Sequence, residues 1–299
     1  MIVPAPVTTG ATIGVVAPAG AVKPEALERG IALLRAWGFA VRLGEHVLAR
    51  ARYCAGEPEQ RARDLDVMFR DAEVAAIICA RGGFGTAQVL PLLDPSLLTA
   101  HPKLVWGYSD ISPLLGFLVE RCGMVAVHGP MVASDLSRGI NQRASERMLA
   151  LLGSPAMPWR EPVPDIIAPG VASGRLTGGC LSSLVALLGT PYALETEGAV
   201  VFLEDVAERP YRIDRMLTQL RLAGKLEGVA AVILGAFADC DGREEGDKAA
   251  IVLHDFFRGA PYPVVAGFPA GHLSENLPLT FGVPTRVDAH EGYVEVLSA

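Results

Sequence analysis

Three polar side chains, far apart in the chain, have the types and settings that nucleophilic catalysis needs. Ser109 follows the apolar run LVWG and precedes a stretch of helical character, so it lies at a strand-to-helix corner. Glu204 ends the apolar run AVVFLE, and His272 follows a glycine in a loop rich in helix-breaking residues. A serine hydroxyl is a poor nucleophile at neutral pH, and it needs a histidine to take its proton and a carboxylate to orient that histidine. The order serine, acid, histidine therefore raises the hypothesis of an acyl-transfer enzyme.

The corner at Ser109 has two interpretations. A strand that turns sharply into a helix exposes a side chain and points the first N–H groups of the helix outward, where they can stabilise an oxyanion. The usual nucleophile elbow reads G-x-S-x-G, and this chain matches it at Gly107 but has Ile111 two residues after the serine. Alternatively, Ser109 or Asp110 simply caps the helix. The segment by itself leaves both interpretations open.

A glycine-rich loop, ARGGFGT at 80–86, directly follows the apolar run VAAIICA. Adjacent glycines let the backbone approach a ligand closely, and such a loop exposes amide N–H groups. The loop has neither the G-x-G-x-x-G spacing nor the lysine of the common phosphate-binding patterns, so a phosphate site is weakly supported. A second oxyanion donor and a tight turn without function both remain compatible with this loop.

The remaining histidines are weaker candidates for a general base. His272 is itself uncertain, because a lone histidine in a loop is more often a surface or structural group. His128, which closes a strand near the serine corner, is its main competitor. The others occupy polar connections or a helix: His46, His101, His290 and His254. No H-x-x-x-H or paired His/carboxylate spacing indicates a metal, so we expect no metal and no cofactor.

The first half of the chain alternates apolar runs with amphipathic stretches. Helix 24–38 is predicted to begin with a proline and to end at Gly38. Strands apolar on both faces, alternating with helices, predict a mostly parallel sheet flanked by helices. The predicted strands are 12–19, 39–44, 74–80, 104–107 and 124–129, and a second helix is predicted over 58–71.

A proline-rich segment separates this first half from a second one. Residues 154–167 show no helical or alternating period, so we predict a linker between domains 1–153 and 168–299. The second domain is predicted to be mixed α and β. Its strands are expected at 172–179, 198–205, 229–237 and within the alternating segment 285–299, and its helices at 210–224 and 247–259.

Composition restricts the class of protein. The chain has 299 residues, 51% hydrophobic and 20% charged, with a formal net charge of −7. That charge argues against nucleic acid or an anionic membrane as partner, since both select basic surfaces. No window approaches the roughly 18 apolar residues that cross a bilayer. The N-terminus lacks the basic region of a secretory signal, so we expect the mature chain to start there and to stay in the cytoplasm.

The five cysteines do not form a recognisable framework. They are odd in number and never in C-x-x-C spacing, which predicts neither disulfides nor a zinc site. Cys79 and Cys122 lie in apolar surroundings and are expected in the core. The full set is Cys54, Cys79, Cys122, Cys180 and Cys240.

Several blocks of sequence together resemble the LD-carboxypeptidase family of serine peptidases. The blocks are ARGGFGTAQVLPLLD, GYSDISPLL, VHGPM, GGCLSSLVALLGTPY, FLEDVAERPYRIDRMLTQL and AGHLSENLPLTFG. They occur in order from GVVAPAG near the start to the GH loop near the end, so the resemblance covers nearly the whole chain. The family includes the muramoyltetrapeptide carboxypeptidases, with the microcin-C immunity peptidases as relatives.

The resemblance implies a fold and a catalytic triad. It implies an α/β N-terminal domain that supplies the nucleophile, and a β-barrel-like, mixed α/β C-terminal domain that supplies acid and base. Matched block by block, the nucleophile is Ser109, the acid Glu204 and the base His272. The family usually forms homodimers, so a homodimer is expected here.

The resemblance also implies an oxyanion hole. Its donors would be the backbone N–H groups of Asp110 and of a glycine in the RGGFG loop, for which we choose Gly83 over Gly82. Arg81 has two interpretations: it binds the free carboxylate of a substrate, or it braces the loop through a salt bridge.

The chain departs from the family pattern at two positions. Family members more often carry tyrosine where Phe84 stands and asparagine where Cys180 stands. Neither change removes a catalytic group, but the second can alter a loop contact.

The activity implied is removal of the C-terminal D-alanine from murein tetrapeptides during peptidoglycan recycling. Alternatives are cleavage of peptidyl-nucleotide conjugates, a non-catalytic small-peptide-binding protein, and a phosphate-binding enzyme. A nucleobase would need an aromatic stacking platform, and Trp106 lies in a core-like strand. A binding protein has no need of a base, which argues against the non-catalytic alternative. The expected partners are therefore a murein peptide and a second copy of the chain, without nucleic acid or membrane.

Overall fold

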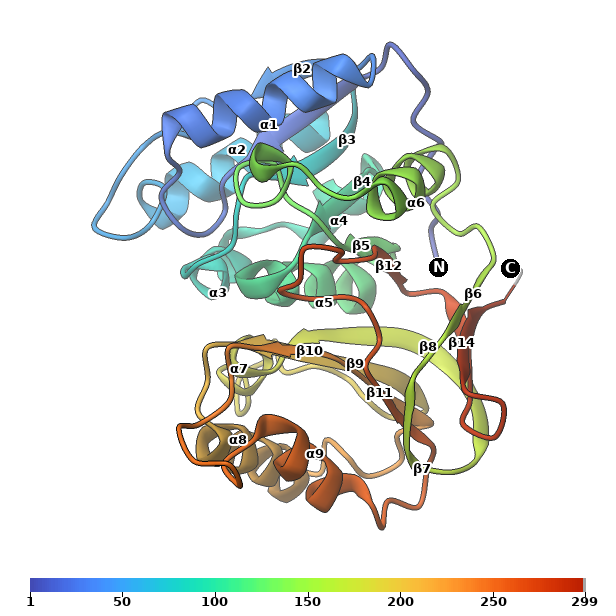
Figure 1. Ribbon diagram of the computed structural model, residues 1–299. Coiled ribbons are helices and arrows are strands. Elements are labelled where there is room, and N and C mark those ends of the chain that lie inside the picture. The colour runs from blue at the N-terminus through green and yellow to red at the C-terminus, as the bar shows by residue number, and fades with distance from the viewer. Residues whose placement is uncertain (298–299) are drawn as a thin grey trace. The chain divides into compact units, whose positions relative to one another are not determined.

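A computed structural model describes residues 1–297, which form two compact units (Figure 1). The first unit comprises Met1–Pro155 together with Leu277–Phe281, and the second comprises Ala156–Asn276 and the chain from Gly282 onward. The sequence ranges assign all of 168–299 to the second domain. The structure differs at Leu277–Phe281, because β12 (Leu279–Phe281) pairs antiparallel with β5 (Ala126–His128) of the first unit.

The first unit is built on a six-stranded sheet. Its strand order is β12-β5-β4-β3-β1-β2, and the pairings among β1 to β5 are all parallel. Besides β5 and β12, the strands are β1 (Thr12–Val16), β2 (Ala40–Leu43), β3 (Val74–Cys79) and β4 (Leu104–Gly107). The prediction of a mostly parallel sheet is confirmed.

Helices cover both faces of this sheet (Figure 1). Helix α1 packs against the 3-10 turn η3 (Leu136–Arg138), whereas α2 contacts α3 and α4, and α3 contacts α5. The helices are α1 (Pro24–Ala36), α2 (Pro58–Arg70), α3 (Thr86–Val89), α4 (Pro95–Ala100), α5 (Ser112–Arg121) and α6 (Gln142–Gly153); the other 3-10 turns are η1 (Leu90–Leu92) and η2 (Ser109–Ile111).

Local sequence explains where the two long predicted helices begin. Proline opens both α1 and α2, because its fixed φ suits a helix and the missing N–H would have had no intrahelical acceptor. At the start of α2, Glu57 and Gln60 form a reciprocal capping box. The predicted ranges 24–38 and 58–71 are therefore confirmed to within two residues.

The strand order decides where loops of the first unit gather. Parallel strands end at the same edge of a sheet. Strand β2 lies on one side of β1 and β3 lies on the other, so the direction of winding changes at β1. Ligands of such sheets bind beyond the carboxyl ends of the strands near this switch point. The segment 17–20 after β1, the loop 80–85 after β3 and Ser109 after β4 all lie at this edge.

The second unit contains an eight-stranded mixed sheet. Its order is β6-β14-β13-β8-β9-β10-β11-β7, with parallel pairing from β8 to β11 and antiparallel pairing elsewhere. The strands are β6 (Trp159–Pro162), β7 (Asp165–Ala168), β8 (Val171–Cys180), β9 (Ala199–Val206), β10 (Ala231–Ala238), β11 (Val264–Ala266), β13 (Pro284–Asp288) and β14 (Tyr293–Val296). Among the described residues, β6 and β7 each pair with one neighbouring strand, so they form the two edges of this sheet.

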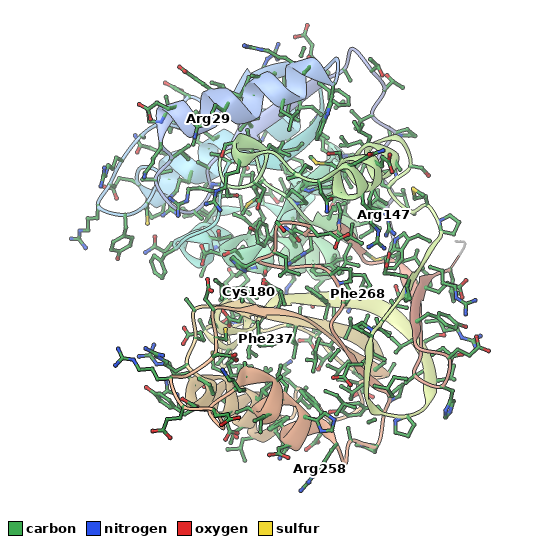
Figure 2. The ribbon with its side chains drawn as sticks, in the orientation of Figure 1. Arg29, Arg147, Cys180, Phe237, Arg258 and Phe268 are labelled. Atoms are coloured by element: carbon green, nitrogen blue, oxygen red, sulfur yellow. The ribbon has the colours of Figure 1, made fainter. Side chains whose placement is uncertain are left out.

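Three helices lie on one face of this sheet: α7 (Leu181–Val185), α8 (Pro210–Leu222) and α9 (Ala249–Phe257) (Figure 1). Apolar side chains such as Leu217, Val232 and Phe257 are buried in one cluster between helices and sheet. On this sheet the Phe268 ring, labelled in Figure 2, packs against Trp159 and Phe202 at centroid distances of 5.9 and 6.3 Å. The α/β class predicted from the sequence is confirmed in both units.

Two predicted segments look different in the structure. Residues 154–167, predicted as a linker, contain β6 and most of β7, the two end strands of the second sheet. Short edge strands tolerate proline, because one row of their N–H groups faces away from the ladder, and they are too short to show a period. The predicted alternating segment 285–299 forms the β13–β14 hairpin, and its last two residues lie outside the described chain.

No helix within residues 1–297 is both long enough and apolar enough to cross a lipid bilayer.

The packing of α1 gives a test of the first unit. Arg29, labelled in Figure 2, donates from Nε to Ser137 O at 3.1 Å, and a Cβ on the neighbouring Gly30 would overlap the Val132 carbonyl. We expect Gly30→Ala to lower the free energy of unfolding by about 1–3 kcal/mol, although alanine is the better helix former. Urea denaturation measures this change.

The matched control is Gly153→Ala at the end of α6, where a Cβ would meet no heavy atom within 4 Å. This variant should be neutral or slightly more stable. Equal effects of the two substitutions would contradict the packing of α1.

Candidate active site

Ser109 has a backbone conformation that residues other than glycine rarely adopt. It comes two residues after the end of β4, begins η2, and has a φ of +62°. A left-handed backbone at such a residue persists only when its surroundings impose it, and such strain gathers at functional sites. Neither Ser109 nor Asp110 caps η2 or α5 with its side chain, which removes the simple capping interpretation.

Gly82 packs directly against this serine. A Cβ on Gly82 would lie 2.8 Å from the Ser109 Cβ, 2.9 Å from its Oγ and 3.2 Å from the Asp110 N. The Gly82 carbonyl accepts from Gly20 N at 3.1 Å. Because the C=O and N–H of a trans peptide point in opposite directions, the Gly83 N–H points away from Gly20. Within residues 1–297 it has no backbone acceptor, so it is available to a ligand.

Arg81 braces the same loop through backbone carbonyls. Its Nε donates to Gly82 O at 3.2 Å and its Nη1 donates to Ala21 O at 3.1 Å. The expected brace is thus present, but its acceptors are carbonyl oxygens and not a carboxylate. Binding of a substrate carboxylate by Arg81 stays a prediction.

The side chain of Asp110 ties the serine turn to the end of the glycine-rich loop. Its Oδ2 accepts from the Thr86 N at 2.9 Å. Burial raises the pKa of Asp110 to about 6, against the opposing effect of the Thr86 N–H and the more distant Arg61. Arg61 itself is buried and donates from Nη1 to Gly85 O at 2.7 Å. The sequence had indicated only the backbone N–H of Asp110, because side-chain contacts across 24 residues leave no local pattern.

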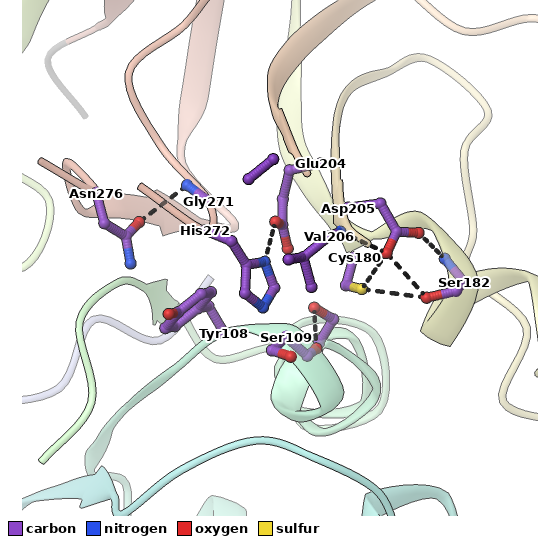
Figure 3. Close-up of polar contacts among 12 residues, drawn as sticks. Tyr108, Ser109, Cys180, Ser182, Glu204, Asp205, Val206, Gly271, His272 and Asn276 are labelled. Carbon is purple, nitrogen blue, oxygen red and sulfur yellow. Dashed lines mark hydrogen bonds and ion pairs between the residues drawn. The ribbon is translucent and has the colours of Figure 1, made fainter. Parts of the chain in front are cut away.

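In the second unit, Glu204 and His272 form a hydrogen-bonded pair (Figure 3). Glu204 lies in β9 with no exposed surface, and its Oε2 is 2.7 Å from the His272 Nδ1. An ionised carboxylate accepts, so the Nδ1 carries the proton and donates it to Glu204. This leaves the Nε2 as the nitrogen that can take a proton from a nucleophile. Two residues chosen from the sequence alone, 68 positions apart, therefore meet.

The loop that carries His272 is shaped by Gly271 and Asn276. The Gly271 φ is +106°, and a Cβ there would lie 2.7 Å from the Glu204 Oε2. The Gly271 N donates to the Asn276 Oδ1 at 2.9 Å, and Asn276 is almost fully buried (Figure 3). Sequence reasoning missed Asn276, although a polar side chain among so many breakers was an available signal.

Comparison with known proteins decides the family. The N-terminal domain of LD-carboxypeptidases matches residues 13–129, and the C-terminal domain of LD-carboxypeptidases matches residues 173–287. The chain belongs to the LD-carboxypeptidase family. It is therefore a member of a peptidase family, in agreement with the resemblance drawn from its sequence blocks.

Individual relatives extend over nearly the whole chain. A probable murein peptide carboxypeptidase of Bacillus subtilis is 36% identical over 293 residues, which covers 96% of this chain and 92% of that protein. A murein tetrapeptide carboxypeptidase of Pseudomonas aeruginosa is 34% identical over 279 residues, covering 90% and 91%. The solved structure of the microcin C7 self-immunity protein MccF has a TM-score of 0.92 at 22% identity, covers 100% and 99%, and shows the shared fold.

Cys180 lies beside Asp205, a second acid of β9. Its Sγ is 3.5 Å from the Asp205 Oδ1 and 3.4 Å from the Ser182 Oγ (Figure 3). Asp205 also accepts from the Ser182 N at 2.8 Å. Burial raises the pKa of both Cys180 and Asp205, so the thiol stays protonated and acts as a donor. Asp205 thereby holds the start of α7 against β9.

The competing histidines lie in other surroundings. His128 is fully buried in the first unit, 5.6 Å from the Tyr108 ring and 5.7 Å from the Phe281 ring between centroids. His46, expected in a polar connection, pairs its Nδ1 with the Asp64 Oδ1 at 2.8 Å. Asp64 also accepts from the His46 backbone N at 2.9 Å, which makes this pair a brace of the loop. Among residues 1–297, no group of three or more His, Cys, Asp or Glu side chains is arranged to hold a metal ion.

The Gly271 backbone gives a test of the Glu204–His272 pair. An alanine there would be strained and would push against the carboxylate that holds the imidazole. We expect Gly271→Ala to lower kcat by at least about tenfold, since misplaced catalytic groups lose rate steeply. NMR of the His272 Nδ1 proton should show loss of its low-field resonance.

Gly189→Ala is the matched control, because Gly189 also has a positive φ, +81°, yet no heavy atom lies within 4 Å of its added Cβ. It should lose stability but keep its turnover number. A similar loss of kcat in both variants would mean that general strain, and not the carboxylate contact, is responsible.

The raised pKa of Asp110 predicts a pH-dependent stability. The folded chain keeps the proton up to about pH 6, whereas the unfolded chain releases it near 3.8, so wild-type stability falls as pH rises through this window. Asp110→Asn lacks this titration. The free energy of unfolding of the variant, relative to wild type, should therefore rise between pH 4 and 7, by up to ~3 kcal/mol.

Urea unfolding at a series of pH values measures this difference. Asp165→Asn, the same change at an exposed position of β7, is the matched control. A stability difference for Asp110→Asn that does not vary with pH would contradict the raised pKa of this carboxyl.

Proposed function

We propose that this chain is a serine carboxypeptidase that removes the C-terminal D-alanine from murein tetrapeptides. The observation that carries the proposal is the 2.7 Å contact between the Glu204 Oε2 and the His272 Nδ1. A carboxylate-oriented histidine is what a serine nucleophile requires. Support for the substrate comes from relatives at 36% and 34% identity that are named as murein peptide and murein tetrapeptide carboxypeptidases.

In the proposed reaction, Ser109 is the nucleophile, His272 the base and Glu204 the orienting acid. The Ser109 Oγ forms a bond to the carbonyl carbon of the L-configured centre of the third residue, while the His272 Nε2 takes the hydroxyl proton. The carbonyl electron pair moves onto oxygen, and the N–H groups of Gly83 and Asp110 bind that oxyanion.

The intermediate then collapses and the peptide C–N bond breaks. D-Alanine leaves with the proton that His272 had taken. Water next attacks the acyl-enzyme, with His272 again as base, and releases the shortened peptide and the Ser109 hydroxyl. The proposal needs the Ser109 hydroxyl to reach the His272 Nε2 during this cycle.

Several parts of the proposal follow from the resemblance. They are a first domain that bears the nucleophile, a second domain that bears acid and base, a homodimer, and a role in peptidoglycan recycling in the cytoplasm. Arg81 is retained as a candidate for the substrate carboxylate, because its two bonds to backbone carbonyls still leave a guanidinium cation beside Gly82.

The competing functions have less support. Cleavage of peptidyl-nucleotide conjugates would use the same residues, but the likeness to the microcin C7 self-immunity protein at 22% identity shows a fold and not a substrate. A non-catalytic peptide-binding protein would have no use for a buried carboxylate bonded to a partly exposed histidine.

The experiment is D-alanine release from a purified murein tetrapeptide, followed by mass spectrometry. Wild type should remove one D-alanine. Ser109→Ala should lose at least about 10³-fold in rate, because substrate binding and the oxyanion hole give only residual catalysis without the nucleophile. Ser154→Ala, at an exposed position after α6, is the matched control and should behave as wild type.

Two outcomes would contradict the proposal. Full activity of Ser109→Ala would reject the serine mechanism. No release by the wild-type chain would reject murein tetrapeptides as its substrate and direct the search to peptidyl-nucleotide conjugates.

A further inference from the structure

Two aromatic side chains of the first unit are unusually exposed. Tyr53 has 60% and Phe84 has 50% of its surface exposed, and their rings form an edge-to-face pair with centroids 5.4 Å apart. Phe84 lies between Gly83 and Gly85 of the glycine-rich loop. Aromatic rings dominate the energetics of binding sites, so a paired, exposed set beside this loop indicates a ligand surface.

A hollow of about 430 Å³ lies beside the pair. Its volume is in the range of small-molecule sites. Its wall is polar and carries charges of both signs, which suits a neutral ligand rich in hydroxyl or amide groups better than an ion. The polar side chains that line it are Arg52, Glu57, Arg61 and Gln88, next to Tyr53.

Some of the side chains that line the hollow also form hydrogen bonds to the glycine-rich loop. The Cys54 Sγ donates to the Phe84 O at 3.4 Å, and the Arg61 Nη1 donates to the Gly85 O at 2.7 Å. The Arg61 Nη2 donates to the Gln88 Oε1 at 2.7 Å. A ligand seated here would therefore contact the residues that hold the loop containing Gly83.

Three successive contacts connect the serine to this hollow. Gly82 packs on Ser109 and bonds to Gly20, and Gly20 forms an antiparallel bridge with Cys54. Neighbouring segments lie about 5 Å apart, so these three contacts make a path of at most roughly 15 Å. An extended peptide covers about 3.3–3.6 Å per residue, so three residues before the scissile bond span roughly 10 Å, and a sugar attached to them extends farther.

We propose that the Tyr53–Phe84 pair and the adjoining hollow bind the amino sugar to which a murein peptide is attached. The apolar C–H face of the sugar ring packs against the aromatic rings, and Arg52, Glu57 and Gln88 bind its hydroxyl and N-acetyl groups. The site makes sugar-bearing tetrapeptides better substrates than free ones. This inference rests on the proposed murein carboxypeptidase function.

The test compares two substrates, a free tetrapeptide and an N-acetylmuramyl tetrapeptide, by D-alanine release. Wild type should show the higher kcat/KM on the muramyl substrate. Tyr53→Ala and Phe84→Ala should each raise KM for that substrate roughly tenfold, equivalent to about 1.4 kcal/mol, without changing kcat. Their kcat/KM on the free tetrapeptide should change by less than about twofold, since no sugar contact is lost.

Two further variants control for indirect effects. Tyr53→Phe keeps the ring and should retain most of the preference for the sugar. Leu222→Ala, at a side chain of the second unit that is 83% exposed, should behave as wild type on both substrates. Equal losses on both substrates in Tyr53→Ala and Phe84→Ala, or no sugar preference in wild type, would overturn the inference.

A binding measurement separates this inference from the proposed function. Calorimetry with N-acetylmuramyl dipeptide, which lacks the third residue and the D-alanine that the proposed reaction removes, should show binding to wild type and weaker binding to Tyr53→Ala. If wild type released no D-alanine from either substrate, the carboxypeptidase proposal would fail, whereas tyrosine-dependent binding of the muramyl dipeptide would still support the sugar site. Absence of that binding would overturn the sugar site whatever the activity.

Discussion

The buried carboxylate of Glu204 is the constraint on which the geometry of its surroundings depends. A carboxylate without exposed surface is strongly destabilising unless a donor compensates it, and the His272 Nδ1 is that donor at 2.7 Å. The donor can approach only because Gly271 has no Cβ to meet the carboxylate oxygen. Asn276 then fixes the loop by accepting the Gly271 N–H. One buried charge thus determines a tautomer, a glycine and a loop conformation.

In the first unit, the surrounding elements support a strained backbone at Ser109. Ser109 holds a φ of +62°, a conformation that costs of order 1–3 kcal/mol and therefore needs support on both sides. β4 anchors it before the turn and α5 after it, and Gly82 fills the space beside its Cβ. The carboxyl of Asp110 joins this turn to Thr86, so the serine and the glycine-rich loop are held by one hydrogen-bonded network.

Part of this geometry could be predicted from the sequence. The apolar runs before Ser109 and Glu204 were visible as strands, because period and composition are local properties of the chain. The residue types serine, glutamate and histidine at strand ends and in a loop were sufficient to raise the hypothesis of a catalytic triad. The same reasoning could not choose between a capping serine and a strained one, since the difference is a backbone angle imposed by neighbours from other segments.

Local sequence patterns predicted the α/β class, the starts of the proline-initiated helices and the polar residues at strand ends. They did not predict that Leu277–Phe281 returns to the first sheet, that 154–167 supplies edge strands, or that Asn276 supports the Gly271 loop. Each of these depends on a partner far away in sequence, as do the His46–Asp64 and Asp110–Thr86 contacts. A local pattern reports the propensity of a segment, whereas a hydrogen-bond partner is selected by which groups the whole fold leaves within about 3 Å.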